Sequence, residues 1–496
     1  MSRNKTILRK IAKQHKLPSI DEVMERTNYY DLQILGDINA SMNNALDRCT
    51  DSLIIELGKR FPNKSKNEIK IAGTRILELA QHKMTEKYPA GEVLIGKTSS
   101  DPYKNSFTNW LLMMRLVPEF QSLGDTIGYK NGEWEFNKGN NNVGPEYANE
   151  MIYEFISLGG INDLSIDNWF ASDDTIMYLG TFNVLIDLYP TINDFGTRLR
   201  EVYLKLLPQM ENQRGLGETI KRSLDIQKNI LWNQLPYNSM DIGAGSCMRS
   251  GCIGLFYPGR TNRDYLISLA IECSRITHNS AIAILGSVAT ALFTAYAVEK
   301  TSINKWPHKF LKILRSGKID NYIKQTRPNE FASFSTDKIL FQGQWEKYIS
   351  FRFSGLVPKL DMKFMKNPVT RIKTLSENYS KGHIDFPGSC GDDAVIMAYD
   401  ALLECGGTIE KLIIYSMLHH GDSDTIGSIA MSWFGIVFFD KKNLKITSEN
   451  RHKLEFHKEI SNLSKLANFT QCPYIYNYDL LLHFAYQFLK NAESYF

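Results

Sequence analysis

Apolar residues recur at helical spacing along most of the chain from residue 105 onward. One clear helical face follows the Gly406-Gly407 pair and a Thr408 cap, and it consists of Ile409, Leu412, Ile413, Ser416, Met417 and His420. Residues Thr175–Tyr189 are apolar on most sides and end at Pro190, which is typical of a buried helix. Alternating strand patterns are few. The pattern therefore predicts an all-α fold.

Helical patterns also occur within the first hundred residues, in Ser52–Arg60 and Ile69–Lys83. They break in the loop Lys97–Pro102, where we expect a domain boundary. The predicted organisation is a small helical N-terminal region in residues 1–102 and a large all-α domain in residues 103–496. A chain of 496 residues is long enough for such a main domain with an addition.

The uncharged stretch Ser280–Val298 approaches the length of about 20 residues that a bilayer requires. It is rich in Ala, Ser, Thr and Gly rather than in Leu and Ile. A closely packed helix inside an all-α core explains this composition better, so we expect no membrane span.

Composition and charge are those of an ordinary globular protein, with 43% hydrophobic and 23% charged residues and a net charge of +4. The basic excess is concentrated near the N-terminus, where Arg3–Lys16 contains six basic residues and no acidic one. A solvated terminus explains this arm more simply than contact with nucleic acid or an anionic membrane, and we expect no stable nucleic acid partner. The seven cysteines include no Cys-x-x-Cys pair, and no secretory signal opens the chain. These features favour free thiols in a reducing compartment and an intracellular, cytoplasmic location.

Two acidic loops are the first candidates for chemistry: Ser172–Thr175 (Ser-Asp-Asp-Thr) and Gly421–Thr425 (Gly-Asp-Ser-Asp-Thr). Each loop immediately precedes a strongly apolar helix, so helix capping explains either loop when it is taken alone. Capping does not need two carboxylates per loop, however. If the loops met, four carboxylates would require cations or protons. Ligation by oxygen atoms alone favours Mg²⁺ or Mn²⁺ over zinc.

Three glycine-bearing segments are the second set of candidates. Small residues in Gly243–Arg249 allow backbone N–H groups to approach an anion, and the segment ends in an arginine that could bind phosphate. Gly388–Asp393 is similar, and the third segment is Gly124–Gly128, followed by Asn131–Glu135. The first two fit neither the Walker nor the dinucleotide-binding pattern, so generic glycine loops remain the alternative.

In this order the motifs resemble the ADP-ribosylglycohydrolase family. They are Gly-Asp-x-x-Gly at Gly124, Ser-Asp-Asp-Thr at Ser172, Gly-x-x-Met-Arg at Gly245, Thr-His-Asn at Thr277 and Gly-Asp-Ser-Asp-Thr at Gly421. The ADP-ribosylarginine hydrolase branch is the most similar, because it shares four further segments: Asn131–Phe136, Cys252–Leu255, Ala291–Val298 and Met397–Ala401. The resemblance runs from about residue 105 to 465 and excludes the first hundred residues.

The resemblance implies a compact orthogonal multi-helix domain with two Mg²⁺ ions in a cleft, for which Mn²⁺ can substitute. The implied metal ligands are Ser172, Asp173 and Asp174 for one ion and Asp422 and Thr425 for the other, with Asp424 between them. Asp173 and Asp174 are the implied catalytic residues, one of them acting as the general base. The implied substrate-binding residues are Asn131, Gly132, Glu133, Glu135, Gly245, Ser246, Cys247, Met248, Arg249, His278, Gly388, Ser389, Cys390 and Gly391.

The sequence departs from the family at Ala244, Cys247, Asp392 and His420, which affects substrate fit more than metal binding. Without the family, His278 would be interpreted as a helix-start or core histidine.

The expected activity is hydrolysis of the N-glycosidic bond between ADP-ribose and a modified protein side chain, with arginine as the expected residue. Mono-ADP-ribosylated proteins or ADP-ribosyl-arginine are the expected partners. Two alternatives remain: an O-linked, serine-directed hydrolase, and a non-catalytic ADP-ribose-binding or structural member of the family.

Overall fold

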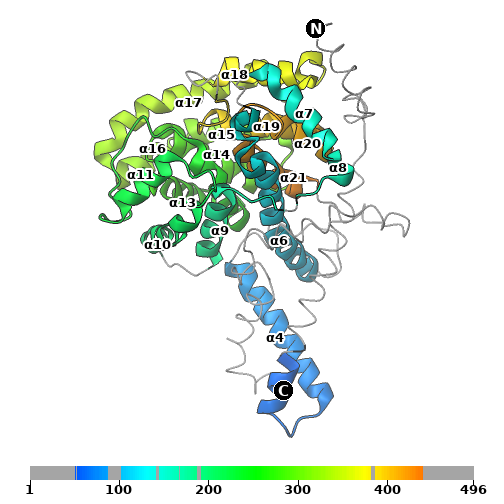
Figure 1. Ribbon diagram of the computed structural model, residues 1–496. Helices are drawn as coiled ribbons and strands as arrows, with labels where there is room; N and C mark the ends of the chain where they lie inside the picture. The colour runs from blue at the N-terminus through cyan, green and yellow to red at the C-terminus, as the bar shows by residue number, and fades with distance from the viewer. Residues whose placement is uncertain are drawn as a thin grey trace.

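The computed structural model describes residues 51, 53–87, 102–140, 144–166, 168–186, 191–380 and 386–438. Its helices are α4 (Lys66–Lys87), α6 (Pro102–Tyr129), α7 (Ala148–Ser157), α8 (Gly160–Asp163), α9 (Asp173–Ile186), α10 (Ile192–Met210), α11 (Glu218–Gln227), α12 (Cys247–Phe256), α13 (Arg263–Arg275), α14 (Ala281–Val298), α15 (Trp306–Arg315), α16 (Lys318–Thr326), α17 (Phe331–Arg352), α18 (Pro368–Tyr379), α19 (Asp393–Cys405), α20 (Ile409–Ser416) and α21 (Ser423–Val437). Residues 53–60 are also helical. In these ranges the sheet consists of the two-residue antiparallel strands β1 (Phe353–Ser354) and β2 (Val357–Pro358). The prediction of an all-α fold is confirmed (Figure 1).

The core is built around α14, in which every residue is buried. Ser280 begins this helix as its cap, because its side chain accepts a hydrogen bond from the backbone N–H of Ala283. Helix α12 packs against α14 so closely that a Cβ at Gly254 would lie 2.0 Å from the carbonyl oxygen of Ala291. By length and composition α14 could cross a membrane, but it lies wholly inside the protein. The prediction of a packed Ala-rich core helix is therefore confirmed.

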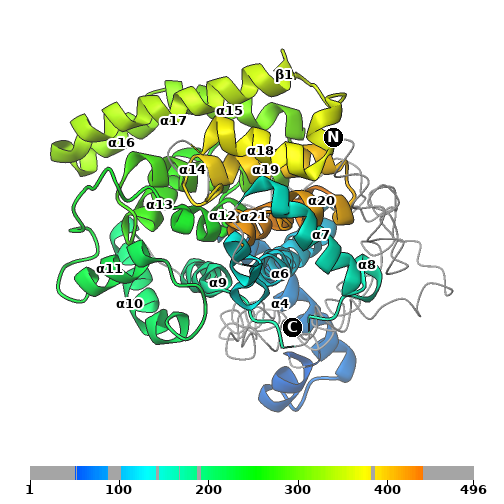
Figure 2. The ribbon, with the colours of Figure 1, turned by 45° about the horizontal axis from the view of Figure 1, so that its top comes forward.

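Helices α6 and α21 form the contact that positions the functional site, and they lie near the middle of the molecule (Figure 2). A Cβ at Gly124 would lie 2.3 Å from the carbonyl oxygen of Gly427, and one at Gly128 would lie 2.3 Å from that of Ser423. The hydroxyl of Ser423 donates a hydrogen bond of 2.7 Å to the carbonyl oxygen of Gly128. Two glycines of α6 thus allow its backbone to touch the backbone of α21, and they account for the spacing of the Gly-Asp-x-x-Gly motif.

Other expected elements also form. The six residues of the face that begins at Ile409 are all buried, although α20 ends at Ser416, so Met417 and His420 follow the helix rather than belong to it. The helix expected at Thr175–Tyr189 is α9, whereas Tyr189 and Pro190 lie outside the described residues.

The described part of the N-terminal region consists of helical residues 53–60, a turn at residues 61–65, and α4, which contacts α6 (Figure 1). Helix α6 begins at Pro102, the last residue of the expected boundary loop. Residues 1–50 and 88–101 lie outside the described residues. The division into residues 1–102 and 103–496 remains a prediction.

Candidate active site

The first acidic loop leads into α9 and is held by groups from other elements. Asp125 of α6 accepts hydrogen bonds from the backbone N–H groups of Ser172 and Thr175, both at 3.0 Å, and from the Thr175 hydroxyl. The hydroxyl of Ser172 accepts a further bond of 3.1 Å from the N–H of Asp174. Asp125 and Ser172 therefore cap α9, and the carboxylates of Asp173 and Asp174 are not needed for that role.

Arg214 holds the same loop from the opposite side. Its guanidinium donates to the carbonyl oxygen of Ala171 at 2.6 Å, and its own carbonyl oxygen accepts from the N–H of Asp173 at 2.8 Å. The guanidinium also lies over the ring of Phe170, at 4.9 Å from its centroid. The loop is thus fixed by both its backbone and its neighbours, so the directions of Asp173 and Asp174 are set before any ligand binds.

The second acidic loop begins α21. The carboxylate of Asp422 is the helix cap and accepts from the N–H of Thr425 at 3.3 Å, and that of Asp424 accepts from the same group at 3.0 Å. The hydroxyl of Ser428 in α21 donates to the carboxylate of Asp174 at 3.1 Å. This bond joins the first acidic loop to the helix that follows the second one, across 254 positions of the chain.

The meeting of the loops concentrates buried carboxyl groups, which we call the acidic cluster: Asp125, Glu135, Asp173, Asp174, Asp422 and Asp424. Burial, followed by the charges of Glu135, Asp125 and Asp422, raises the pKa of Asp173 well above its ordinary value. Burial and neighbouring carboxylates likewise raise the pKa of Asp174 and Asp424. The pKa of Glu135 is raised to about 7, mainly by burial, although Lys138 opposes the shift through an ion pair of 2.8 Å. Such a group of like charges requires either protons or cations.

Two glycine loops that the sequence marked separately are paired with each other. Gly243 and Cys390 form an antiparallel bridge, with hydrogen bonds from Ala244 N–H to the Ser389 carbonyl at 2.9 Å and from Gly391 N–H to the Ile242 carbonyl at 2.8 Å. His278 packs beneath this bridge, because a Cβ at Gly245 would lie 2.8 Å from its Cε1 atom. Glycine at position 245 is therefore required, because any larger residue would place its Cβ too close to the imidazole ring.

Backbone hydrogen bonds connect the paired glycine loops to the acidic cluster. The N–H of Asp422 donates to the carbonyl of Pro387 at 2.8 Å, and the N–H of Phe136 donates to the carbonyl of Gly421 at 2.9 Å. The rings of Phe136 and Phe386 also meet edge to face, 5.5 Å apart. The loops at residues 133–140, 242–246, 386–391 and 421–425 therefore form one continuous arrangement, in which a ligand held by the glycine loops can extend to the acidic cluster.

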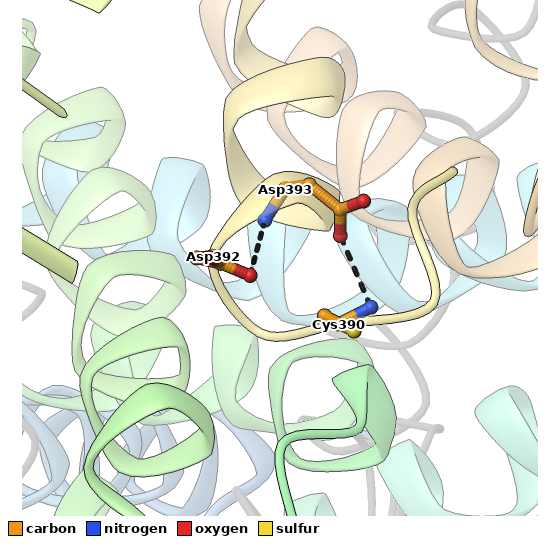
Figure 3. A group of neighbouring side chains, drawn as sticks. All are labelled: Cys390, Asp392 and Asp393. Carbon is orange, nitrogen blue, oxygen red and sulfur yellow. Dashed lines mark hydrogen bonds between the residues drawn. The ribbon is translucent and has the colours of Figure 1, made fainter. Parts of the chain in front are cut away.

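A second group of potential metal ligands lies in the glycine loops. Cys390, Asp392 and Asp393 place one ligand-capable atom each within 4.8 Å of one another (Figure 3). Asp393 already accepts from the Ser380 hydroxyl at 2.6 Å and from the N–H groups of Gly388 and Cys390 at 2.8 and 3.0 Å. These bonds account for its burial without an ion. We therefore interpret Asp393 as the residue that shapes the 388–391 loop, a role that the sequence analysis missed.

Comparison with known proteins identifies the family of the chain. A family profile described as ADP-ribosylglycohydrolase matches residues 121–471. The chain belongs to the ADP-ribosylglycohydrolase family. It is 50% identical over 454 residues to "Putative ADP-ribosyl glycohydrolase L444" of Acanthamoeba polyphaga mimivirus, covering 87% of this chain and 88% of that protein.

It is also 30% identical over 370 residues to ADP-ribosylhydrolase ARH1 of Dictyostelium discoideum, covering 69% of this chain and 90% of the relative. Among solved structures, an ADP-ribosylglycohydrolase-related protein complex aligns with a TM-score of 0.38 and 15% identity, covering 72% of this chain and 98% of that one. The resemblance inferred from the motifs is confirmed by the family profile and the two relatives.

The surroundings of Arg249 correct one expectation for this ADP-ribosylglycohydrolase. Its guanidinium is fully buried and donates to the carbonyls of Gly245 and Cys273, at 2.7 and 2.8 Å, and to the Thr277 hydroxyl at 2.7 Å. It also lies over the ring of Tyr203. Arg249 therefore braces the glycine loop from inside and is not free to bind a phosphate.

The other residues expected around Arg249 are also buried. Cys247 and Met248 lie in α12, and the Ser246 hydroxyl donates a hydrogen bond of 2.9 Å to the Ala283 carbonyl. Burial lowers the pKa of His278 well below its ordinary value, so its imidazole is neutral, and its Nδ1 lies 2.8 Å from the Thr277 hydroxyl. Of the segment Gly245–Arg249, the backbone at Gly245 remains the best placed to contact a ligand.

The implied substrate-binding residues between Asn131 and Glu135 lie in two different surroundings. Glu135 belongs to the acidic cluster, whereas the exposed carboxylate of Glu133 forms an ion pair with Lys130. Asn131 supports the neighbouring loop, accepting from Phe170 N–H at 2.7 Å and donating to the Asn168 carbonyl at 3.1 Å. Asn131 and Gly132 adopt left-handed backbone conformations, with φ of 56° and 85°. Charge alone did not distinguish Glu133 from Glu135 in the sequence, because pairing and burial decide their roles.

Replacing Asp393 with Asn tests whether its carboxylate holds the 388–391 loop in shape. The amide would present an NH₂ group to one of the N–H groups that the carboxylate now accepts, so we expect the 388–391 loop to loosen. The KM for an ADP-ribosylated substrate should rise by ~10-fold, about 1.4 kcal/mol, the scale of one lost hydrogen bond to a charged group. Steady-state kinetics at saturating Mg²⁺ measure this. An unchanged KM with an increased requirement for Mg²⁺ would instead assign Asp393 to the metal site.

Proposed function

We propose that this protein hydrolyses the N-glycosidic bond between ADP-ribose and a modified arginine side chain, and so reverses mono-ADP-ribosylation. The observation that carries the proposal is the direct connection between the paired glycine loops and the acidic cluster in a chain of the ADP-ribosylglycohydrolase family. Glycine loops suit a diphosphate, and clustered carboxylates suit chemistry at a sugar.

The acidic cluster fits two divalent cations. Its donors are carboxylate and hydroxyl oxygens, which Mg²⁺ and Mn²⁺ prefer. The raised pKa values of its buried carboxyl groups support this proposal, because cations are one of the two ways, with protons, to relieve the repulsion there. The residues that would hold the ions are Ser172, Asp173, Asp174, Asp422, Asp424 and Thr425. When bound, such ions stabilise negative charge and lower the pKa of water.

The chain's own residues supply orientation and proton transfer. Asp173 or Asp174 accepts a proton from the attacking water, whose oxygen bonds to the anomeric carbon of the ribose. The electron pair of the carbon–nitrogen bond leaves with the guanidine, which takes up a proton to become the guanidinium of the restored arginine. Glu135, with a pKa of about 7, is the acidic neighbour able to hold or release a proton near neutral pH.

Space for the rest of the ligand lies beyond the paired glycine loops. A cavity of about 220 Å³ is lined by Ile242, Ile282, Leu340, Tyr379 and Cys390, and also by polar side chains that include Asp337, Gln344 and Asp392. Apolar and aromatic side chains beside a polar loop suit a nucleoside. This cavity supports a placement in which the adenosine end lies past the bridge and the distal ribose faces the acidic cluster.

The linkage that is cleaved is the finer part of the proposal. The guanidinium of an arginine-linked substrate carries charge that Glu135 can stabilise, whereas a serine-linked substrate offers no such charge. We expect release from ADP-ribosyl-arginine to be at least ~10-fold faster than from ADP-ribosyl-serine peptides, a difference of ~1.4 kcal/mol. Parallel assays of freed ADP-ribose on the two substrates measure the ratio.

Two variants sharpen this comparison. Glu135→Gln should reduce the ratio of the release rate from ADP-ribosyl-arginine to that from ADP-ribosyl-serine. Glu133→Gln is the matched control and should leave this ratio unchanged, because the Glu133 carboxylate is paired with Lys130 away from the acidic cluster. A preference for serine in the wild-type protein would refute the arginine assignment and favour the O-linked alternative. Binding of ADP-ribose without release from either substrate would favour the non-catalytic one.

A further inference from the structure

Asp125 occupies a position that the proposed reaction has not used. It is fully buried in α6, and its two oxygens accept from both Ser172 and Thr175 N–H groups and from the Thr175 hydroxyl. A carboxylate offers about four acceptor positions. Three donor groups of a single loop take up most of them, so Asp125 is bound to the loop that carries Asp173 and Asp174.

The backbone on either side of Asp125 is fixed to the other acidic loop. Gly124 and Gly128 bring α6 into contact with the backbone of α21, and the Ser423 hydroxyl bonds to the Gly128 carbonyl. Asp125 therefore connects the two loops: its main chain is fixed relative to Asp422 and Asp424, and its side chain holds the loop of Asp173 and Asp174.

We infer that Asp125 is a positioning residue that sets the spacing between the two acidic loops, and through it the affinity for divalent cations. The inference rests on the proposed function. Asp125 itself does not need to touch the ions, because its oxygens are occupied by the first loop. An amide at this position would present an NH₂ group to N–H donors, so the first loop would shift away from the second.

The experiment uses Mn²⁺ alone as the probe, with the full-length chain and no substrate. Mn²⁺ binding is measured by electron paramagnetic resonance, together with the melting temperature. A separate assay with an ADP-ribosylated substrate measures the dependence of kcat and KM on Mg²⁺. We expect Asp125→Asn to weaken Mn²⁺ binding by at least ~10-fold, the effect typical of groups that orient metal ligands. The Mg²⁺ midpoint should rise in parallel, with KM at saturating Mg²⁺ changed by less than ~2-fold.

Three further variants separate positioning from general stability. Thr175→Val removes one donor to Asp125 and should shift Mn²⁺ affinity in the same direction by a smaller factor, while Thr175→Ser, which keeps the hydroxyl, should restore it. Asp400→Asn is the matched control for a buried carboxylate, since Asp400 accepts from Tyr348 and Arg352 in α17. It should lower the melting temperature without changing Mn²⁺ affinity.

The possible results distinguish this inference from the proposed function. If Asp125→Asn and Thr175→Val lower the melting temperature but bind Mn²⁺ as tightly as the wild type, Asp125 has only a structural role and the inference is wrong. If the wild-type protein binds no Mn²⁺ and turns over without a divalent cation, the metal site and this inference are both wrong, although the hydrolytic activity stands. If the wild-type protein binds Mn²⁺ but releases no ADP-ribose from modified arginine, the proposed function is overturned and the inference about cation affinity is not.

Discussion

Replacing Asp174 or Asp422 with Asn should reduce turnover by at least ~1,000-fold, about 4 kcal/mol in the barrier, while the fold is retained. The two residues belong to different loops of the acidic cluster, and each variant would remove a ligand from the proposed site for two divalent cations. The metal-free protein should not lose stability, because burial raises the pKa of both groups in the folded chain, and neighbouring carboxylates raise that of Asp174 further. Asparagine keeps the size of the side chain and removes one of the repelling charges.

Thermal unfolding at different pH values measures how the raised pKa values of these carboxyl groups affect the stability of the metal-free protein. A carboxyl group whose pKa is higher in the folded than in the unfolded state binds its proton more tightly when folded, so metal-free stability should fall as pH rises through the interval between the two values. Mg²⁺ should restore stability above that interval in the wild type and restore less in Asp174→Asn. Asp392→Asn is the control, because Asp392 belongs to the group with Cys390 and Asp393, outside the acidic cluster. Loss of the Mg²⁺ response in Asp392→Asn alone would move the metal site to that group.

Gly128→Ala should destabilise the protein by about 1–3 kcal/mol, the usual cost of overpacking. The added Cβ would lie 2.3 Å from the carbonyl oxygen of Ser423, and this atom belongs to backbone that cannot rotate away. Alanine is intrinsically better than glycine in a helix by about 1 kcal/mol, so a net loss would show that the contact between α6 and α21 outweighs helix propensity. Mn²⁺ affinity should fall as well, since the same contact positions both acidic loops.

Gly343→Ala provides the matched control for this substitution. Gly343 lies in α17, and a Cβ there would meet no atom within 4 Å. We expect this variant to be neutral or more stable by up to about 1 kcal/mol. Chemical denaturation of both variants measures the difference, and a stabilised Gly128→Ala would contradict the close contact between the two helices.

The fold could be predicted from the sequence because its signals are local. The face beginning at Ile409, the apolar stretch of α9 and the Ala-rich composition of α14 each depend on residues within a few turns of one another. The end of α20 at Ser416 was missed, because the apolar periodicity continues through residues that follow the helix without belonging to it.

The site was only partly predictable, because its assembly depends on distant contacts. Motifs identified both acidic loops, but the hydrogen bond between Ser428 and Asp174, which joins the first loop to α21, has no local signal. Asp125 lies 47 residues before Ser172, so its capping role appears only in three dimensions. Arg249 shows the opposite error: its chemistry suggested phosphate binding, whereas burial commits it to backbone carbonyls.

We propose that the acidic cluster releases ADP-ribose from modified arginine with the help of divalent cations. The most direct measurement is the free ADP-ribose produced from arginine-modified protein by the wild type and by Asp174→Asn, each with Mg²⁺ and with chelator. We expect release by the wild type with Mg²⁺ and none above background in the other three reactions. Equal release by the wild type in chelator, or undiminished release by Asp174→Asn, would contradict it.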